Sequence, residues 1–400
     1  MELIRFIWIL LQVGIGYNLV LPGFIYLLSF FKNNQPKALQ TSAADYAIIV
    51  TAYEQVTHIP AVVSSLLQLN YEQYLIYIVA DKCDISQLKF NDDRVIILRP
   101  EATLASNTRS HFYAINNFKR PHNRLTIIDS DNLVHPEYLN ELDCYFNQGY
   151  IAVQGIRKAK NLDTTYACLD AARDIYYHFY DGKLLFNVGS SATLAGSGMA
   201  FTTALYRDCL ENRDVTGAGF DKVLQYLIVK QNHRIAFNEQ AVVYDQKTSE
   251  TDQLVNQRAR WINTWFKYFG YGFKLLFTGI RNFSLNQFLF GLILLRPPLF
   301  LFLAFSVICA LTDLEIHSVY SWFWLIGCII FVWSFLIALW RSDTDKRIYS
   351  SLAGIPKFMF FQFVSLARSH KANKHSVATK HAILIKPEGM DADKNNLKTY

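Results

Sequence analysis

Several common signatures are missing from this 400-residue sequence. Its six cysteines are scattered without a paired short spacing, which argues against a zinc site or a disulfide framework and fits a reducing compartment. No G-x-x-x-x-G-K-[ST] phosphate loop occurs, and "GAGFDKV" at 217–223 only partly imitates a G-x-G-x-x-G turn. The net charge of +6 is too small and too dispersed to indicate nucleic-acid binding. The sequence therefore predicts no zinc, P-loop or nucleic-acid-binding protein.

Hydrophobic residues, by contrast, make up 52% of the chain and gather in separate runs. Residues 6–31 carry no charge and exceed the roughly 20 residues that span a bilayer. This run is too long for the apolar part of a signal peptide, so we predict an N-terminal membrane anchor. Residues 285–311, which contain Pro297 and Pro298, form a second predicted span that the prolines kink or shorten. Residues 318–340 form a third, with aromatic residues at both ends.

The apolar runs divide the chain into five predicted regions. A shorter run at 355–367 cannot span a membrane and predicts an interfacial helix. The regions are a transmembrane anchor at 1–36, a soluble α/β domain at 40–283, two transmembrane helices at 284–341, an interfacial helix region at 342–381 and a polar tail at 382–400.

Charges beside the spans predict the orientation. The connector 312–317 has two acids and no Lys or Arg, whereas basic residues flank the other ends of the spans: Lys32, Lys37, Arg281, Arg341, Lys346 and Arg347. By the positive-inside rule, the soluble domain and the C-terminus are cytoplasmic, in an integral protein of the plasma (bacterial inner) membrane. The net positive charge then favours contact with anionic membrane lipids.

The soluble region alternates apolar strands with helices. The predicted strands are 46–53, 75–81, 94–100, 124–131 and 150–157. Helices are predicted at 58–70, with Thr57 as N-cap and Pro60 in the first turn, and near 108–118. Continuous apolar strands separated by helices indicate an α/β fold with a mostly parallel sheet covered on both faces.

Acidic residues collect where these strands end. Thr51 to Glu54 end the first strand, Asp81 ends the second, and Asp129 and Asp131 end "RLTIIDSD". Parallel sheets bind ligands at this edge, although Asp81 alone could equally be a helix cap. Asp129 and Asp131, at i and i+2, project the same way, and two like charges require a cation between them. Aspartates without Cys or His suit Mg²⁺ or Mn²⁺, which would hold the diphosphate of a nucleotide-linked ligand.

These motifs resemble those of membrane-integrated family-2 glycosyltransferases, the inverting enzymes of GT-A (Rossmann-like) fold that include cellulose, chitin and hyaluronan synthases. The resemblance covers about 45–265. It rests on "TAYEQ" at 51–55, "VADKCD" at 79–84, the D-x-D motif "DSD" at 129–131, "GSGMAF" at 196–201 and the Q-x-x-R-W motif "NQRARW" at 256–261.

The resemblance implies a role for each matched residue. A UDP-sugar donor would contact Thr51, Tyr53, Glu54, Asp81, Asp129 and Arg260; Mn²⁺ or Mg²⁺ would bind Asp129 and Asp131; the acceptor would contact Gly196, Ser197, Gly198, Gln257 and Trp261. The last motif also has physical support, because residues at i, i+3 and i+4 share one helix face. An Arg fork suits a diphosphate, and a Trp ring offers a flat surface to a sugar. A plain amphipathic helix at the membrane is the alternative.

The catalytic base is the least regular feature of the match. The family opens the helix after the acceptor segment with an acidic pair, whereas this chain has Phe220 followed by Asp221. Asp221 corresponds to the second acid and would take the proton of an acceptor hydroxyl; Asp214 is the nearest alternative. The hydroxyl would displace the UDP directly, and the metal and Arg260 would stabilise the charge on the leaving group.

Three other functions remain open. In a phosphatase of the haloacid-dehalogenase type, Asp129 would be the nucleophile and Asp131 the acid/base, but Leu133 stands where Thr or Val is usual. A membrane protein that binds a nucleotide sugar without turnover fits the missing acid. Within the transferase interpretation, three spans favour adding one sugar to a lipid-linked acceptor. The alternative is a processive polysaccharide synthase whose secretion channel is completed by partners or by a homo-oligomer.

Overall fold

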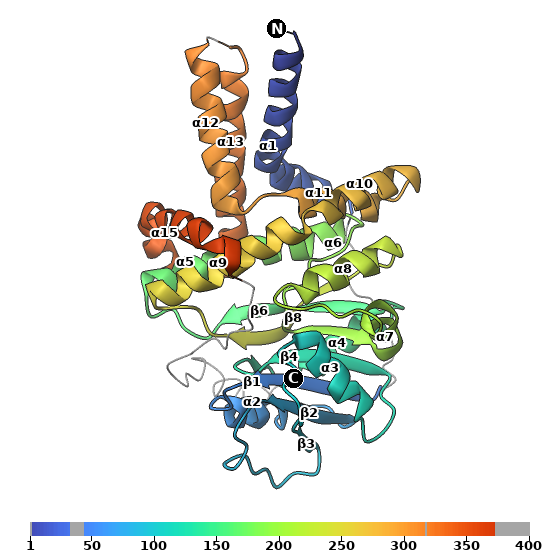
Figure 1. Cartoon of the computed structure of the whole chain (residues 1–400). Helices are drawn as coiled ribbons and strands as arrows, with labels where there is room; N and C mark the ends of the chain where they lie inside the picture. Colours follow the sequence, from blue (N-terminus) through green and yellow to red (C-terminus); the bar gives the residue numbers. More distant parts are fainter. Residues whose placement is uncertain (1, 33–43, 317, 373–400) are drawn as a thin grey trace, which may run out of the picture.

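The structure is a computed structural model that describes residues 2–32, 44–316 and 318–372. Figure 1 shows three helices that project together from a layered α/β body, with shorter helices crossing at their base. The projecting helices are α1 (Glu2–Ser29), α12 (Leu299–Glu315) and α13 (Ser321–Arg341). The predicted polar tail at 382–400 lies outside the described residues.

An eight-stranded sheet forms the centre of the body, in the order β3-β2-β1-β4-β7-β6-β8-β5. Its strands are β1 Tyr46–Tyr53, β2 Tyr74–Asp81, β3 Val95–Leu98, β4 Arg124–Asp129, β5 Leu133–Val134, β6 Ala152–Ala159, β7 Met199–Thr202 and β8 Ala236–Asp245. Strands β3, β2, β1 and β4 are mutually parallel, as are β6 and β8, whereas β7 runs antiparallel to β4 and β6, and β5 antiparallel to β8. The predicted α/β fold with a mostly parallel sheet is therefore confirmed.

Helices cover the sheet and continue toward the projecting group. They are α2 Ile59–Leu66, α3 Asn107–Asn116, α4 Tyr138–Phe146, α5 Thr165–Tyr177, the π-helical η1 His178–Leu184, α6 Leu185–Asn187, α7 Thr203–Leu210, α8 Phe220–Lys230, α9 Thr251–Tyr268 and α10 Gly270–Arg281. Pro60 lies in the first turn of α2, as expected. The predicted Thr57 cap is wrong, because the chain enters α2 one residue later, at His58, which makes no side-chain capping hydrogen bond.

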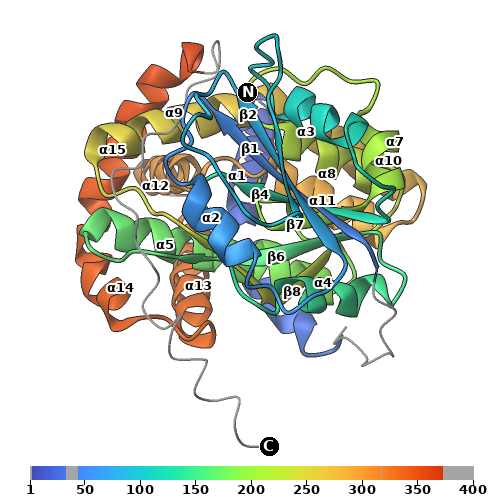
Figure 2. The same ribbon diagram turned by 90° about the horizontal axis from the view of Figure 1, so that it is seen from below.

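The C-terminal part contains α11 Leu285–Leu295, α14 Lys346–Ser351, η2 Leu352–Gly354, α15 Ile355–Arg368 and η3 Ser369–Lys371. Figure 2 shows α14 and α15 along one side of the molecule, next to α5. The helix expected at 355–367 is present as α15; its interfacial position remains a prediction. By length and composition, α1 and α13 are able to cross a membrane, and α11 with α12 would add a third span only if the bent pair counts as one.

The predicted span at 285–311 is divided in two by a bend of 77°. The break falls at Arg296–Pro298, where proline lacks the N–H that would continue a helix. Polar contacts hold α11 on the soluble body: Gln287 Nε2 donates to the carbonyls of Val229 (3.2 Å) and Lys230 (3.0 Å). Of the two halves of this bent pair, α12 lies beside α1 and α13, whereas α11 lies on the soluble body (Figure 1).

A buried carboxylate joins the three projecting helices. Asp313 of α12 is fully buried and accepts hydrogen bonds from Gln12 Nε2 (2.8 Å), Trp8 Nε1 (3.2 Å) and Trp324 Nε1 (3.1 Å). Residues 312–315 of the predicted connector are helical, since α12 continues through Glu315. The helix is able to include an acid here because N–H groups of α1 and α13 satisfy it.

Candidate active site

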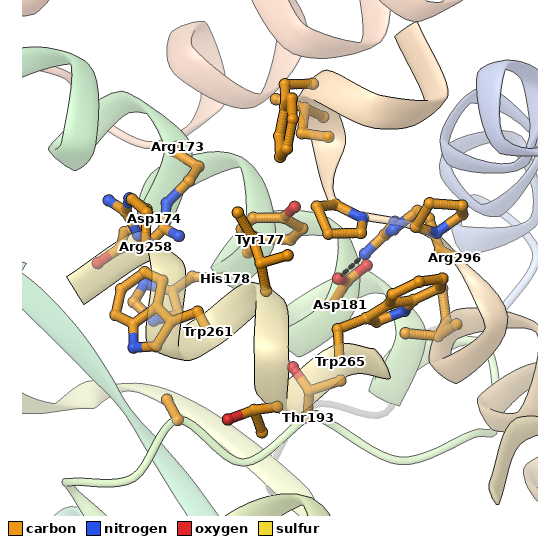
Figure 3. Close-up of a pocket in the computed structure, with 18 of the residues that line it drawn as sticks. Arg173, Asp174, Tyr177, His178, Asp181, Thr193, Arg258, Trp261, Trp265 and Arg296 are labelled. Carbon is orange, nitrogen blue, oxygen red and sulfur yellow. Dashed lines mark hydrogen bonds and ion pairs between the residues drawn. The ribbon is translucent and has the colours of Figure 1, made fainter. Parts of the chain in front are cut away.

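A cavity of about 930 Å³ joins the end of β4 to the C-terminal helices. Its polar wall comes mainly from β4, α5, η1, α8 and α9, and its apolar wall from α12, α13 and α15. Figure 3 shows the side chains of α5, η1 and α9 converging on this space. The volume is within the range of pockets that enclose a small ligand.

Six residues predicted from the sequence line this cavity: Asp129, Gly196, Asp221, Gln257, Arg260 and Trp261. They come from segments up to 132 positions apart in the chain (Asp129 to Trp261), so the fold brings the D-x-D strand, the Gly-rich segment and the Q-x-x-R-W helix together. Seven other predicted residues lie outside the cavity lining: Thr51, Tyr53, Glu54, Asp81, Asp131, Ser197 and Gly198.

Strand register places most of this second group along one edge of the sheet. Thr51 of β1 is paired with Asp129 of β4, and Tyr53 is paired with Asp81 of β2. Parallel pairing makes these strands end together, as the sequence predicts. The predicted donor residues are therefore neighbours of the D-x-D motif.

Asp81 is held by its own chain. Asp81 is 2% exposed, and its two carboxylate oxygens accept hydrogen bonds from the backbone N–H groups of Leu104 (2.9 Å) and Ala105 (2.7 Å). The carboxylate thus fixes the loop that leads into α3. The alternative of a structural role for Asp81 has this direct support, and its contact with a nucleobase or ribose remains a prediction.

Glu54 and Lys82 directly follow the paired ends of β1 and β2. Both adopt left-handed backbone conformations, with φ of 60° and 55°, which are uncommon outside glycine. Their side chains form an exposed ion pair of 2.7 Å, and the hydrogen bond from Lys82 lowers the pKa of Glu54. Two adjacent strained residues at a strand edge are typical of ligand-binding sites.

The D-x-D turn is shaped by Ser197. This fully buried hydroxyl accepts the backbone N–H of Asp129 (3.1 Å) and the side-chain amide of Asn132 (2.7 Å). Gly196 and Gly198 flank it with φ of +86° and +67°, a region that favours glycine. The Gly-rich segment therefore supports the acidic motif, and its predicted contact with an acceptor is not tested by this geometry.

The acidic pair has the electrostatics of a cation site. Loss of hydration and the neighbouring Asp131 raise the pKa of Asp129 to about 7, against the opposing effect of Arg157. Within residues 2–32, 44–316 and 318–372, no group of three or more His, Cys, Asp or Glu is arranged to hold a metal ion. Asp129 and Asp131 fit an oxygen-preferring ion that is completed by water and phosphate oxygens.

Asp221 lies in the first turn of α8 and faces the cavity. Lys222 Nζ lies 3.3 Å from its Oδ2 atom. The competing Asp214 lies outside the cavity lining and pairs with Arg109 (Nε–Oδ1 3.0 Å), with both side chains about half exposed. Of the two acids considered from the sequence, only Asp221 is in place to meet a ligand in the cavity.

Phe220 stands where the family has its first acid. Its ring is buried and packs edge-on against His111, with centroids 5.0 Å apart. Burial lowers the pKa of His111 to about 3, so this histidine is neutral. Phe220 thus packs into the core and also contributes to the cavity lining.

The sequence reasoning missed a row of polar residues that runs from α5 into η1. Asp170, Arg173, Asp174, Tyr177, His178 and Asp181 lie at the spacing of one helix face, and all but Asp170 line the cavity. Each acid in the row is paired: Asp170 with Arg258, Asp174 with Lys247 and Arg173, and Asp181 with Arg296. The i, i+3, i+4 spacing in "DAARDIYYHFYD" was the available signal.

The Q-x-x-R-W motif lies on α9, and its three residues share the face toward the cavity, as predicted. Burial lowers the pKa of Arg260. The Trp261 ring, which is 36% exposed, lies close to two guanidinium groups, that of Arg258 at 4.0 Å and that of Arg173 at 4.3 Å from its centroid.

Comparison with known proteins places this arrangement in context. The family described as "Glycosyltransferase like family 2" matches residues 43–264, more than half of the chain. No curated protein matches the sequence. Among solved structures, the mannosyltransferase PcManGT from Pyrobaculum calidifontis, in complex with GDP-Man and Mn²⁺, aligns with a TM-score of 0.59 and 12% identity over 91% of this chain and 96% of that one. Residues 1–349 of TarS from S. aureus, in complex with UDP-GlcNAc, align with a TM-score of 0.44 and 11% identity over 82% and 90%.

The structure of PcManGT shares the GT-A fold across nearly the full length of both chains. The family match leaves no support for the phosphatase interpretation of the D-x-D strand. With its D-x-D turn, its Q-x-x-R-W helix and a GT-A sheet, the chain belongs to glycosyltransferase family 2 and is an enzyme that transfers a sugar from a nucleotide-sugar donor.

Proposed function

We propose that the chain is a membrane-bound inverting glycosyltransferase that moves a sugar from a UDP-sugar to a lipid-linked acceptor. One observation carries this proposal: Asp129 and Asp221 line the same cavity as Phe331 of α13 and Phe358 of α15. A water-soluble acceptor would gain nothing from such an apolar wall, whereas a hydrocarbon chain is stabilised by it.

The donor is assigned to the carboxyl ends of β1, β2 and β4. Thr51, Tyr53, Glu54 and Asp81 would contact the nucleobase and ribose, with Arg260 directed at the diphosphate. Asp129 and Asp131 would hold Mn²⁺ or Mg²⁺, which when bound neutralises charge on the diphosphate. PcManGT, solved with GDP-Man and Mn²⁺, offers a precedent for such a donor and ion on this fold.

Asp221 would act as the general base. It takes the proton of an acceptor hydroxyl, whose oxygen attacks the anomeric carbon from the side opposite the leaving diphosphate. Gln257, Trp261 and Gly196 would orient the acceptor sugar. Attack from the opposite side inverts the configuration at that carbon.

A growing polysaccharide is the second candidate acceptor. Trp261, Trp265, Tyr268 and Tyr271 all line the cavity, in a row along α9 and α10. Such a row suits the faces of consecutive sugar rings. A homo-oligomer or a secretion partner would then complete the export path.

The basic residues Arg281, Arg341 and Lys346 favour a cytoplasmic side for the catalytic domain and the C-terminus. This orientation gives the active site access to cytoplasmic nucleotide sugars.

The test is nucleotide release by the detergent-purified full chain, with Mn²⁺, Mg²⁺ or EDTA. The donors are UDP-glucose, UDP-N-acetylglucosamine, UDP-galactose and UDP-glucuronate, with GDP-mannose as the contrasting nucleotide. We expect metal-dependent UDP release with one donor, lost in Asp131→Asn. Release from GDP-mannose alone would contradict the choice of UDP. Donor binding without release, in the presence of membrane lipid extract, would contradict the transferase mechanism. Product length separates single addition from polymerisation.

A further inference from the structure

Arg258, two residues before Arg260 on α9, has guanidinium atoms that the protein leaves unpaired. The residue is 2% exposed and lines the cavity. Its Nη2 atom pairs with Asp170, but among the described residues its Nε and Nη1 atoms have no hydrogen-bond partner. A buried N–H without an acceptor is destabilising, and more so on a charged group. The site is therefore incomplete without an acceptor of hydrogen bonds.

A second guanidinium lies beside it. Arg173 contacts Asp170 (3.4 Å) and Asp174 (2.5 Å), yet its buried Nε atom also lacks a partner among the described residues. Figure 3 shows Arg173, Asp174 and Arg258 gathered beside Trp261. Burial and the adjacent Arg173 lower the pKa of Arg258 to about 10, although Asp170 acts in the opposite direction. Among the described residues, Nε and Nη1 of Arg258 and Nε of Arg173 have no acceptor, and N–H groups of two adjacent guanidinium ions favour an anionic ligand.

The space next to this pair is apolar and belongs to the C-terminal helices. Leu169 of α5 and Leu254 of α9 pack with Phe358 of α15, one helical turn from Arg173 and Arg258, respectively. Phe335 and Leu336 of α13 and Met359 of α15 extend the apolar lining of the same cavity. A molecule that fills both parts must combine an anionic group with a hydrocarbon chain.

We propose that Arg173 and Arg258 bind the phosphate of a lipid-phosphate-linked sugar, which is the acceptor. Its hydrocarbon chain lies among α12, α13 and α15, and its sugar lies against Trp261 and reaches Asp221. This inference rests on the proposed transferase function and names the chemistry of its acceptor. The donor diphosphate is assigned to Asp129 and Asp131 with Arg260, two of which, Asp129 and Arg260, line a different part of the same cavity.

The experiment measures binding of farnesyl phosphate to the full chain in detergent, with farnesol and inorganic phosphate as separate probes. UDP with Mn²⁺ is titrated in parallel. Arg258→Gln removes the proposed contact and leaves Asp170 with only its 3.4 Å contact to Arg173, so Arg258→Gln/Asp170→Asn is the variant that removes both charges of the Arg258–Asp170 pair. The exposed Arg207, which pairs with Glu211, provides the control variant Arg207→Gln.

We expect farnesyl phosphate to bind the wild type more tightly than farnesol or phosphate. Because a hydrogen bond to a charged group contributes about 1.5–3 kcal/mol, the double variant should bind it roughly 10- to 100-fold more weakly. UDP binding should be unchanged in that variant, and Arg207→Gln should bind both ligands normally.

Three results would overturn the inference: equal binding of farnesol, equal binding of inorganic phosphate, or undiminished binding of farnesyl phosphate by the double variant. Loss of UDP binding in the double variant alone would assign Arg258 to the donor instead. Failure of the wild type to bind UDP would contradict the proposed function instead. The parallel titration with UDP and Mn²⁺ measures this separately from lipid binding.

Discussion

Arg296, at the break between α11 and α12, forms a buried ion pair with Asp181 of the π-helical segment η1. Both side chains are at most 5% exposed, and both residues line the cavity. The pair therefore connects the C-terminal helices to the wall of the active site.

Removing one partner of this pair should destabilise the fold. Arg296→Met leaves a buried carboxylate without its cation, which costs about 3–5 kcal/mol. Arg296→Met/Asp181→Leu should lose less than either single change, because it removes both charges. Thermal unfolding in detergent measures the difference. Lys183→Met, at an exposed pair with Glu239, should change stability by about 1 kcal/mol or less. Equal losses in Arg296→Met and Lys183→Met would refute the structural importance of the buried pair.

Metal affinity should depend on pH through Asp129. Its pKa of about 7 in the metal-free protein means that a proton competes with the cation below neutral pH. Competition with one proton predicts about tenfold weaker Mn²⁺ binding at pH 6 than at pH 8. Calorimetric titration across this range checks the slope. Affinity that stays constant would show that Asp129 is already ionised or is not a ligand.

The same pKa makes a stability prediction. In the metal-free protein, burial and Asp131 destabilise the ionised form of Asp129. Its favourable contribution to the free energy of unfolding is therefore present below about pH 4 and is lost as the pH rises through about 7. In Asp129→Asn, the free energy of unfolding should therefore change less between pH 4 and pH 7 than it does in the wild type. Added Mn²⁺ should do the same in the wild type at high pH, because it stabilises the ionised form.

Asp221→Asn should reduce turnover by about 10²–10⁴-fold, the usual contribution of a general base. Donor binding should be largely kept, since the change removes a proton acceptor and no predicted donor contact. Asp214→Asn is the matched control, because Asp214 is an exposed acid paired with Arg109 outside the cavity. Steady-state rates and UDP titrations decide between them. A strong loss in Asp214→Asn with normal Asp221→Asn would exchange their roles.

Ser197→Ala should weaken metal binding. The change leaves the N–H of Asp129 and the amide of Asn132 without their shared acceptor, at a cost of about 1–3 kcal/mol. The D-x-D turn then loses its fixed geometry. The apparent dissociation constant of Mn²⁺ should therefore rise, while the KM for the acceptor stays the same. The exposed Ser64→Ala serves as control. A change confined to the acceptor KM would instead support the acceptor contact predicted from the sequence.

The strands that the sequence predicted best are those buried on both faces. The run at 46–53 coincides with β1, and the run at 75–81 is β2 less one residue, because continuous apolar residues leave little choice of structure. Strand β7 was not predicted. It has only four residues after a glycine-rich turn, and its antiparallel place between β4 and β6 depends on partners remote in sequence.

Some residues of the candidate site were likewise predicted from the sequence, and others were missed. The D-x-D and Q-x-x-R-W residues were identified from their spacing and from the family resemblance, and Asp221 from the resemblance alone; the fold brings members of all three motifs to one cavity. The charged row from Asp170 to Asp181 was missed, because such spacing also describes a solvated helix face. Its burial depends on Lys247, Arg258 and Arg296, which are 73 to 115 positions away from their partners in the row. The apolar wall of the cavity depends on the bend at Arg296, which hydropathy alone does not reveal.

The Asp313 carboxylate also has a consequence for the order of synthesis. Gln12 and Asp313 are separated by 301 residues, so the first helix emerges from the ribosome long before the acid that receives its N–H groups. Trp8 and Gln12 are therefore without that partner until nearly four-fifths of the chain has been made. The contact that joins the first helix to α12 therefore forms late in translation, and a chain interrupted before α12 would leave the Gln12 amide without the carboxylate that accepts its hydrogen bond.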